Sequence, residues 1–221
     1  MDDRQKLAFL SPVGPVTVSA GSCEIVAMTI TVVLNGTSSA GKTSIAEAIR
    51  ALSPLPWQIS GIDTFLALVP DTMFAAPGAD ATSEGFTWSA ATVDGVACWD
   101  VVPGAQALGF ARAVHQYWAA SAAEGFNQVI DHVLLSSVIA ADLTTRLAPH
   151  RPLYVGVRCP SDVIDERERQ RGDRVIGQGR GIASHVHNYV PYDLEIDTSV
   201  LNSEEAAHSV LAAVNAAGLT A

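Results

Sequence analysis

The feature that most constrains the fold is an eight-residue loop that fits the pattern G-x-x-x-x-G-K-[ST] at every fixed position. The Ile/Val/Thr-rich run 29–34 before it predicts a buried parallel strand. Residues 43–51 after it predict a helix, which Pro54 and Pro56 end. The loop consists of Gly36, Thr37, Ser38, Ser39, Ala40, Gly41, Lys42 and Thr43.

This strand-loop-helix arrangement predicts a site for the phosphates of ATP. Gly36 and Gly41 permit backbone angles that a Cβ would block. Successive N–H groups can then meet phosphate oxygens near the start of a helix. Lys42 would add a point charge over the β- and γ-phosphates, and the Thr43 hydroxyl would ligate Mg²⁺. The alternatives are a chance match in a Gly/Ser-rich turn and a dinucleotide site, whose G-x-G-x-x-G fingerprint does not use the Lys-Thr pair.

The rest of the chain alternates strand-like and helix-like segments. Such alternation predicts an α/β fold with a doubly wound, parallel, five-stranded sheet and helices on both faces. We expect Ser161 to cap one of the helices. The other strands are expected at 57–62, 127–135, 151–157 and 193–196, and the other helices at 105–124, 140–147, 161–171 and 204–217.

Two regions depart from this alternation. Residues 1–27 show no clear period and are interpreted as an N-terminal extension, which leaves 28–221 as one domain. Residues 64–104 are irregular and rich in Pro and Gly, and such long inserts in compact domains are often binding segments. We expect an acceptor-binding insert here, whose aromatic residues either line a pocket or belong to the core. These are Phe74, Phe86, Trp88 and Trp99.

Charge and composition exclude several partners. The formal net charge of −10 argues against a nucleic-acid partner, because phosphate backbones are bound mainly by excess Lys and Arg. No apolar run reaches the roughly 18 residues of a membrane span. Three scattered cysteines, Cys23, Cys98 and Cys159, favour reduced thiols in a cytoplasmic protein. Nothing in the sequence indicates an oligomeric state.

Two carboxylates follow predicted strands, where ligands bind in open α/β sheets. Asp63 ends the second strand and could accept the proton of an attacking hydroxyl; alternatively, it caps a helix that begins at Thr64. Asp131 lies near the end of the third strand and resembles a Walker-B carboxylate that holds Mg²⁺. Its alternative role is to orient a loop.

Six of the 13 basic residues lie between positions 158 and 180. Arg167, Arg171 and Arg174 have the i, i+4, i+7 spacing of one helix face, although Gly172 is expected to end that helix before Arg174. We interpret residues 160–181 as an arginine lid that stabilises the transferred phosphoryl group, with glycines that let it move. The alternative is a solvated helix face with acidic partners.

The chain resembles the chloramphenicol phosphotransferases in several segments, taken in order. The resemblance implies a P-loop kinase fold and Mg²⁺-assisted transfer of the ATP γ-phosphate to a hydroxyl of a small neutral molecule, in the family a primary alcohol of the antibiotic. It also implies that Asp63 is the catalytic aspartate and that Arg167, Arg171 and Arg174 are the lid arginines. The segments are VVLNG (32–36), SSAGKT (38–43), GID (61–63), VID (129–131), VGVRC (155–159), RGDRV (171–175), VH (186–187) and YDLEIDT (192–198).

The sequence departs from this family at Thr37, where the family loop has a glycine, and across residues 71–104. The acceptor is therefore less constrained than the chemistry. Other small-metabolite kinases, including enzymes similar to zeta toxins, and a nucleotide-binding homologue without antibiotic activity remain alternatives. Residues 64–104 contain no Lys or Arg, which favours a neutral acceptor over an anionic one.

Overall fold

The structure is a computed structural model that describes residues 29–75, 77–78, 84–172 and 175–219. The predicted N-terminal extension, residues 1–27, lies outside the described residues. None of the described helices is both long enough and apolar enough to cross a membrane.

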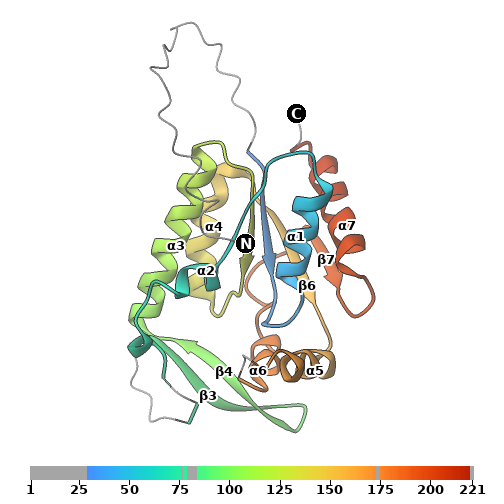
Figure 1. Cartoon of the computed structure of the whole chain (residues 1–221). Helices are drawn as coiled ribbons and strands as arrows, with labels where there is room; N and C mark the ends of the chain where they lie inside the picture. The colour runs from blue at the N-terminus through green and yellow to red at the C-terminus, as the bar shows by residue number, and fades with distance from the viewer. Residues whose placement is uncertain (1–28, 76, 79–83, 173–174, 220–221) are drawn as a thin grey trace, which may run out of the picture.

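A five-stranded parallel sheet forms the centre of the domain, as the sequence predicts (Figure 1). Its strand order, β2-β5-β1-β6-β7, places the strand before the phosphate loop in the middle. All five residues of β1 are buried, because helices cover both faces of the sheet. The strands are β1 (Thr31–Asn35), β2 (Gln58–Gly61), β5 (Gln128–His132), β6 (Leu153–Arg158) and β7 (Leu194–Asp197).

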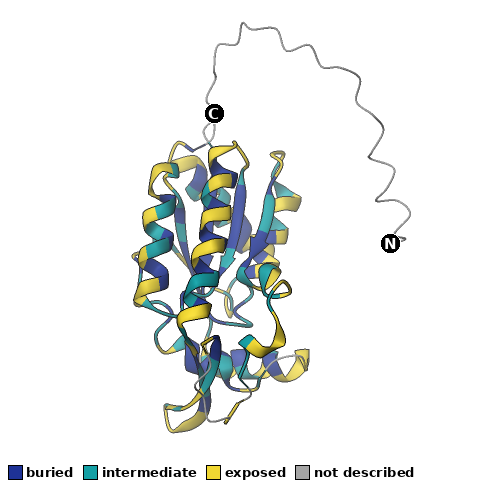
Figure 2. Ribbon diagram, turned by 90° about the vertical axis from the view of Figure 1, so that its left-hand side faces the viewer, coloured by how far each residue is buried: buried dark blue, intermediate teal, exposed yellow. Residues whose placement is uncertain are grey.

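The two faces of the sheet carry separate cores. Val32 and Leu34 of β1 lie in the core formed with helices α1 (Lys42–Leu52) and α7 (Ser203–Ala216). Val33 points to the opposite face, into the core formed with α3 (Ala105–Ala123) and α4 (Ser137–Leu147). This alternation follows from the two-residue period of a strand. In Figure 2 the outer helices bury one side and expose the other.

The insert 64–104, which is predicted to be irregular, contains a β-hairpin, so this prediction is wrong for its second half. Strands β3 (Phe86–Val93) and β4 (Val96–Pro103) pair antiparallel around Asp94 and Gly95. Both turn residues have positive φ, 52° and 76°, which is the backbone of the type I′ turn favoured by Asp-Gly. Earlier in the insert lie the short helix α2 (Ile62–Leu66) and a 3-10 turn, Asp71–Met73.

Two helices follow β6 and lie beside the hairpin, at the end of the sheet where the strands terminate (Figure 1). They are α5 (Ser161–Arg171) and α6 (Gln178–Ala183). The expected cap of α5 is wrong by one residue: Pro160 is the N-cap, without a side-chain hydrogen bond, and Ser161 is already helical. Elsewhere Asn202 caps α7 through its side-chain oxygen, and a 3-10 turn, Ala148–His150, precedes β6.

Candidate active site

The phosphate loop joins β1 to α1 and lies close to its neighbours. A Cβ on Gly36 would lie 2.4 Å from the Val157 carbonyl oxygen, so only glycine lets the loop pass β6 at this distance. Gly41 has a φ of 95°, a conformation that glycine adopts without strain. Thr37 is almost fully buried, and its hydroxyl donates a hydrogen bond of 2.7 Å to the carbonyl oxygen of Gly179 in α6. Thr37 therefore connects this loop to α6.

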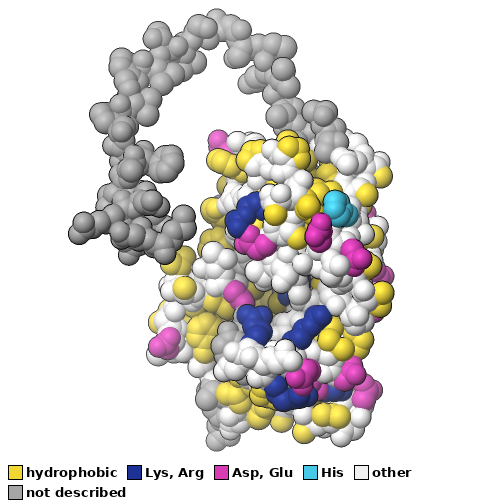
Figure 3. All heavy atoms as spheres, turned by 45° about the vertical axis from the view of Figure 1, so that its right-hand side comes forward, with side chains coloured by type: hydrophobic (Ala, Val, Ile, Leu, Met, Phe, Trp, Pro, Cys, Tyr) yellow, Lys and Arg dark blue, Asp and Glu magenta, His cyan; other side chains and the backbone are white. Residues whose placement is uncertain are grey.

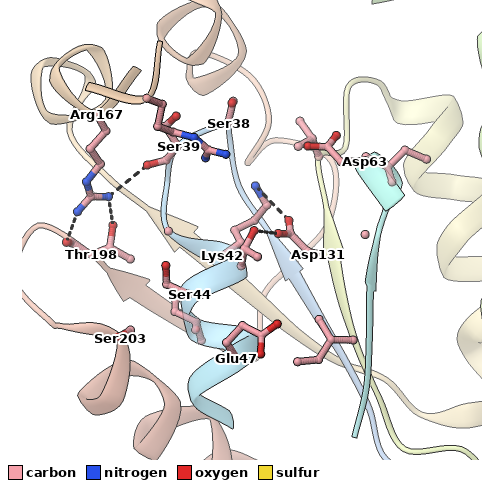
Figure 4. A pocket seen from close by; sticks show the side chains of 18 of the residues that line it. Ser38, Ser39, Lys42, Ser44, Glu47, Asp63, Asp131, Arg167, Thr198 and Ser203 are labelled. Carbon is pink, nitrogen blue, oxygen red and sulfur yellow. Dashed lines mark hydrogen bonds and ion pairs between the residues drawn. The ribbon is translucent and has the colours of Figure 1, made fainter. Parts of the chain in front are cut away.

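Three residues predicted to act on phosphate and metal lie together at the end of this loop (Figure 4). The Lys42 ammonium donates to the Thr37 carbonyl oxygen at 2.8 Å and lies 3.3 Å from Asp131 Oδ1. The Thr43 hydroxyl donates to Asp131 Oδ2 at 2.6 Å. A hydroxyl and a carboxylate at this distance are hard oxygen donors of the kind that bind Mg²⁺ together with water and substrate phosphate.

A cleft of about 810 Å³ is lined by Ser38, Ser39, Gly41, Lys42 and Thr43 of the loop and by the predicted site residues outside the loop that the structure describes. Lys42 lies in its middle in Figure 4, with Arg167, Thr198 and Ser203 on one side and Asp63 on the other. Basic side chains gather around a hollow in the surface (Figure 3). The cleft thus extends to both sides of Lys42, and we call these two sides the arm with Asp63 and the arm with Arg167.

Asp63 lines one arm of the cleft from the first turn of α2. Because β2 pairs with β5, Gly61 lies opposite Asp131, and the two carboxylates follow neighbouring strand ends. A Cβ on Gly61 would lie 2.6 Å from the Asp131 carbonyl oxygen, so glycine is needed for this approach. The alternative role of Asp63 as a helix cap is not observed, since α2 begins at Ile62 with Gly61 as its N-cap.

Arg167 lies in the other arm and bridges three parts of the chain. Its guanidinium donates to the Thr198 hydroxyl at 3.0 Å, to the Thr198 carbonyl at 2.8 Å and to the Ser39 carbonyl at 3.3 Å. Arg171 also lines the cleft, whereas Arg174 lies outside the described residues. Thr198 was missed as a site residue, although its place directly after β7, at the carboxyl edge of the sheet, was a usable signal.

The rest of the cleft lining differs from the expected aromatic pocket. It includes the apolar residues Val101, Val133 and Ile182 and the polar residue Gln178. Of the cleft-lining residues in the described part of the chain, none is one of the four expected aromatics. Phe74 and Phe86 instead stack on each other, with ring centroids 5.7 Å apart, in the small core beneath the hairpin.

The glycines after α5 serve close packing. A Cβ on Gly179 would lie 2.3 Å from Ile164 Cγ2, and a Cβ on Gly181 would lie 2.1 Å from the Trp99 carbonyl oxygen. The buried Glu168 carboxylate accepts hydrogen bonds from the Gly177 and Gly179 amides at 2.8 and 2.7 Å. Helix α6 is therefore held by both α5 and β4.

A buried polar chain lies behind Asp131 without lining the cleft. His132 contacts His115 at 2.9 Å between their Nε2 atoms, and His115 Nδ1 contacts Asp142 at 2.8 Å. Burial holds the pKa of His132 well below its usual range, and burial also lowers the pKa of His115. Both rings are neutral near pH 7, so they add no positive charge beside Lys42.

Comparison with known proteins shows the family. The sequence profile described as "Chloramphenicol phosphotransferase-like protein" matches residues 29–215. A relative from Mycobacterium tuberculosis, named "Putative O-phosphotransferase Rv2636", is 34% identical over 184 residues, covering 81% of this chain and 79% of its own. The chain belongs to the chloramphenicol phosphotransferase-like family and is a phosphotransferase.

Solved structures of low sequence identity share the fold. The Mycobacterium tuberculosis APS kinase CysC, in complex with AMPPNP and APS, aligns with a TM-score of 0.57 at 14% identity, covering 85% of this chain and 98% of the kinase. A sugar kinase from Janibacter sp. aligns with a TM-score of 0.56 at 16% identity, covering 87% and 99%. These similarities show the P-loop kinase fold that the sequence resemblance implies.

Proposed function

We propose that this phosphotransferase moves the γ-phosphate of ATP to a hydroxyl of a small neutral molecule, with chloramphenicol as the first candidate acceptor. The observation that carries the proposal is the cleft, in which the phosphate loop, the Thr43–Asp131 pair and Asp63 share one cavity. Since the reaction consumes ATP, we propose that the protein works in the cytoplasm.

The nucleotide would lie along the loop. Backbone N–H groups of the loop would receive the phosphates, with the Lys42 charge over the β- and γ-phosphates. The arm with Arg167 and Thr198 would take the nucleoside, since it leads away from Asp63. Thr43 and Asp131 would hold Mg²⁺, which neutralises part of the phosphate charge when it is bound.

Asp63 would act as the general base. Its carboxylate would take the proton of the acceptor hydroxyl while that oxygen forms a bond to the γ-phosphorus. The bond between the γ-phosphorus and the bridging oxygen breaks, and ADP leaves with the electron pair. Arg171 and Arg174, together with Arg167, would form part of a lid of residues 160–181 and stabilise the negative charge on the transferred group.

The nature of the acceptor arm supports a neutral substrate. We assign the three apolar residues of the cleft lining, Val101, Val133 and Ile182, to this arm, and the insert 64–104 contains no Lys or Arg to pair with an anionic acceptor. This favours an antibiotic-like alcohol over the nucleotide sugar that an enzyme similar to zeta toxins would take. The family description makes chloramphenicol the first compound to test.

The test is ADP release from Mg²⁺-ATP with and without chloramphenicol, with mass spectrometry of the drug. We expect a phosphate on the drug, and we expect Asp63→Asn to lower kcat by about 10²–10⁴ with little change in ATP affinity. Asp71→Asn, an exposed carboxylate of the same insert outside the cleft lining, serves as the matched control. Wild-type turnover by Asp63→Asn would refute the base assignment, and ATP binding without any product would favour a nucleotide-binding homologue.

A further inference from the structure

Gln178, the first residue of α6, is a polar residue of the cleft lining. It lines the cleft together with Val101, Val133 and Ile182 and is half-buried. The family resemblance assigns it no role. Its contacts, however, define which chemical group it offers to a bound molecule.

The orientation of the Gln178 amide follows from its partner on the hairpin. Trp88 Nε1 donates a hydrogen bond of 2.8 Å to Gln178 Oε1. An indole N–H can only donate, so the amide oxygen must face Trp88 and the amide nitrogen must point away from it. Among the residues that the structure describes, no acceptor takes the two Nε2 hydrogens of Gln178. The side chain therefore offers donors that a ligand in the cleft can use.

The backbone that carries Gln178 is fixed on both sides. Glu168 accepts from the amides of the residues before and after it, Gly177 and Gly179. Arg180, two residues further, donates to Asp165 of α5 at 2.7 Å. A donor that is already oriented loses little side-chain entropy when a ligand binds, which favours specific recognition.

We propose that Gln178 determines acceptor specificity by donating an Nε2 hydrogen to an uncharged oxygen, such as a carbonyl, of the acceptor molecule. Trp88 is then a positioning residue that holds the amide in this orientation. Because the amide is neutral, it does not compensate the cost of taking a charged group out of water. An acceptor that lacks the oxygen would leave the amide hydrogens unpaired and bind less well. This inference rests on the proposed function.

Chloramphenicol is a suitable probe because it is uncharged and carries amide and nitro oxygens besides its hydroxyls. In the full-length enzyme with Mg²⁺-ATP, we expect Gln178→Met to raise the KM for chloramphenicol about tenfold. The kcat and the KM for ATP should change little. Trp88→Phe keeps an aromatic ring but removes the donor, and should raise the KM for chloramphenicol about threefold. Gln106→Met, on the exposed side of α3, controls for the substitution itself.

The double variant Trp88→Phe/Gln178→Met separates positioning from packing. If Trp88 acts through Gln178, the double variant should have the same KM as Gln178→Met alone. An additional threefold rise would overturn the positioning role of Trp88. Gln178→Glu is a second variant, which keeps an oxygen for Trp88 but has no donor for the ligand. It should also lose affinity for the drug.

The possible outcomes distinguish the inference from the proposed function. If the wild type phosphorylates chloramphenicol and the KM of Gln178→Met and Gln178→Glu is unchanged, the inference fails and the proposed function stands. If the wild type does not phosphorylate chloramphenicol, the proposed acceptor fails and the inference fails with it. A rise in KM that is confined to chloramphenicol, with ATP binding intact, supports the role of Gln178.

Discussion

The contact between α6 and β4 is tight enough that one methyl group at Gly181 should disturb it. A Cβ at this position would lie 2.1 Å from the Trp99 carbonyl oxygen, 2.6 Å from the Trp99 carbonyl carbon and 3.0 Å from the Asp100 nitrogen. All three atoms belong to the backbone of β4, which is paired with β3 and cannot yield alone. Since non-bonded heavy atoms prefer roughly 3.5 Å, α6 would have to move by about 1.4 Å.

The energetic consequence of Gly181→Ala combines two opposite contributions. Overpacking of this kind costs about 1–3 kcal/mol, and the shift of α6 also strains the hydrogen bond between Thr37 and Gly179. Ala in place of a helical Gly stabilises by about 0.5–1 kcal/mol. We expect the free energy of unfolding to fall by about 2 kcal/mol, and the Tm to fall by about 4–8 °C for a domain of this size.

Urea denaturation and a thermal scan measure this effect, with Gly109→Ala as the control. Gly109 lies within α3, and the nearest heavy atom to its added Cβ is Arg112 Nη2, at 3.7 Å. This substitution should therefore stabilise the protein by about 0.5–1 kcal/mol. If Gly181→Ala were as stable as Gly109→Ala, α6 would not be held against β4, and the preorganisation of Gln178 would lose its basis.

Two further predictions concern the phosphate loop and its surroundings. Thr37→Val removes the donor to the buried Gly179 carbonyl and should cost about 1–2 kcal/mol in urea denaturation; Thr37→Ser should stay near the wild type, and equal stability of all three proteins would contradict the role of this hydrogen bond. Burial lowers the pKa of His187 to about 4, so the folded state binds this proton less readily than the unfolded state. The contribution of His187 to the free energy of unfolding is complete above about pH 6.5. It is lost as the pH falls toward about 4, by up to about 1.4 kcal/mol per pH unit. His187→Asn should make the free energy of unfolding depend less steeply on pH in this range, and an unchanged dependence would count against the lowered pKa of His187.

The sheet and the phosphate loop were predictable because their signals are local. The loop needs only its eight residues, and the central strands are short apolar runs next to helical segments. The hairpin was missed because its strands mix exposed Ser89 and Ala90 with aromatic residues, so that neither strand shows a clean alternation. The turn Asp94–Gly95 was the one clear signal in that region.

The part of the cleft lining that we assign to the acceptor was not predictable in the same way, since its residues come together only through tertiary contacts. Val101 comes from the hairpin, Val133 follows β5, and Gln178 begins α6. Aromatic residues in an insert suggested a pocket, yet the structure uses Phe74 and Phe86 as a core that supports the hairpin. Trp88 affects the cleft indirectly, by its hydrogen bond to Gln178.

Thr37 of the phosphate loop contacts both Lys42 and helix α6. Its carbonyl oxygen accepts a hydrogen bond from Lys42, which would reach the phosphates of ATP, and its hydroxyl donates to Gly179, next to Gln178. A glycine at position 37 would retain the first contact, which uses the backbone, and lose the second. Thr37 thus contacts both the lysine that would bind the phosphates and the helix that carries Gln178.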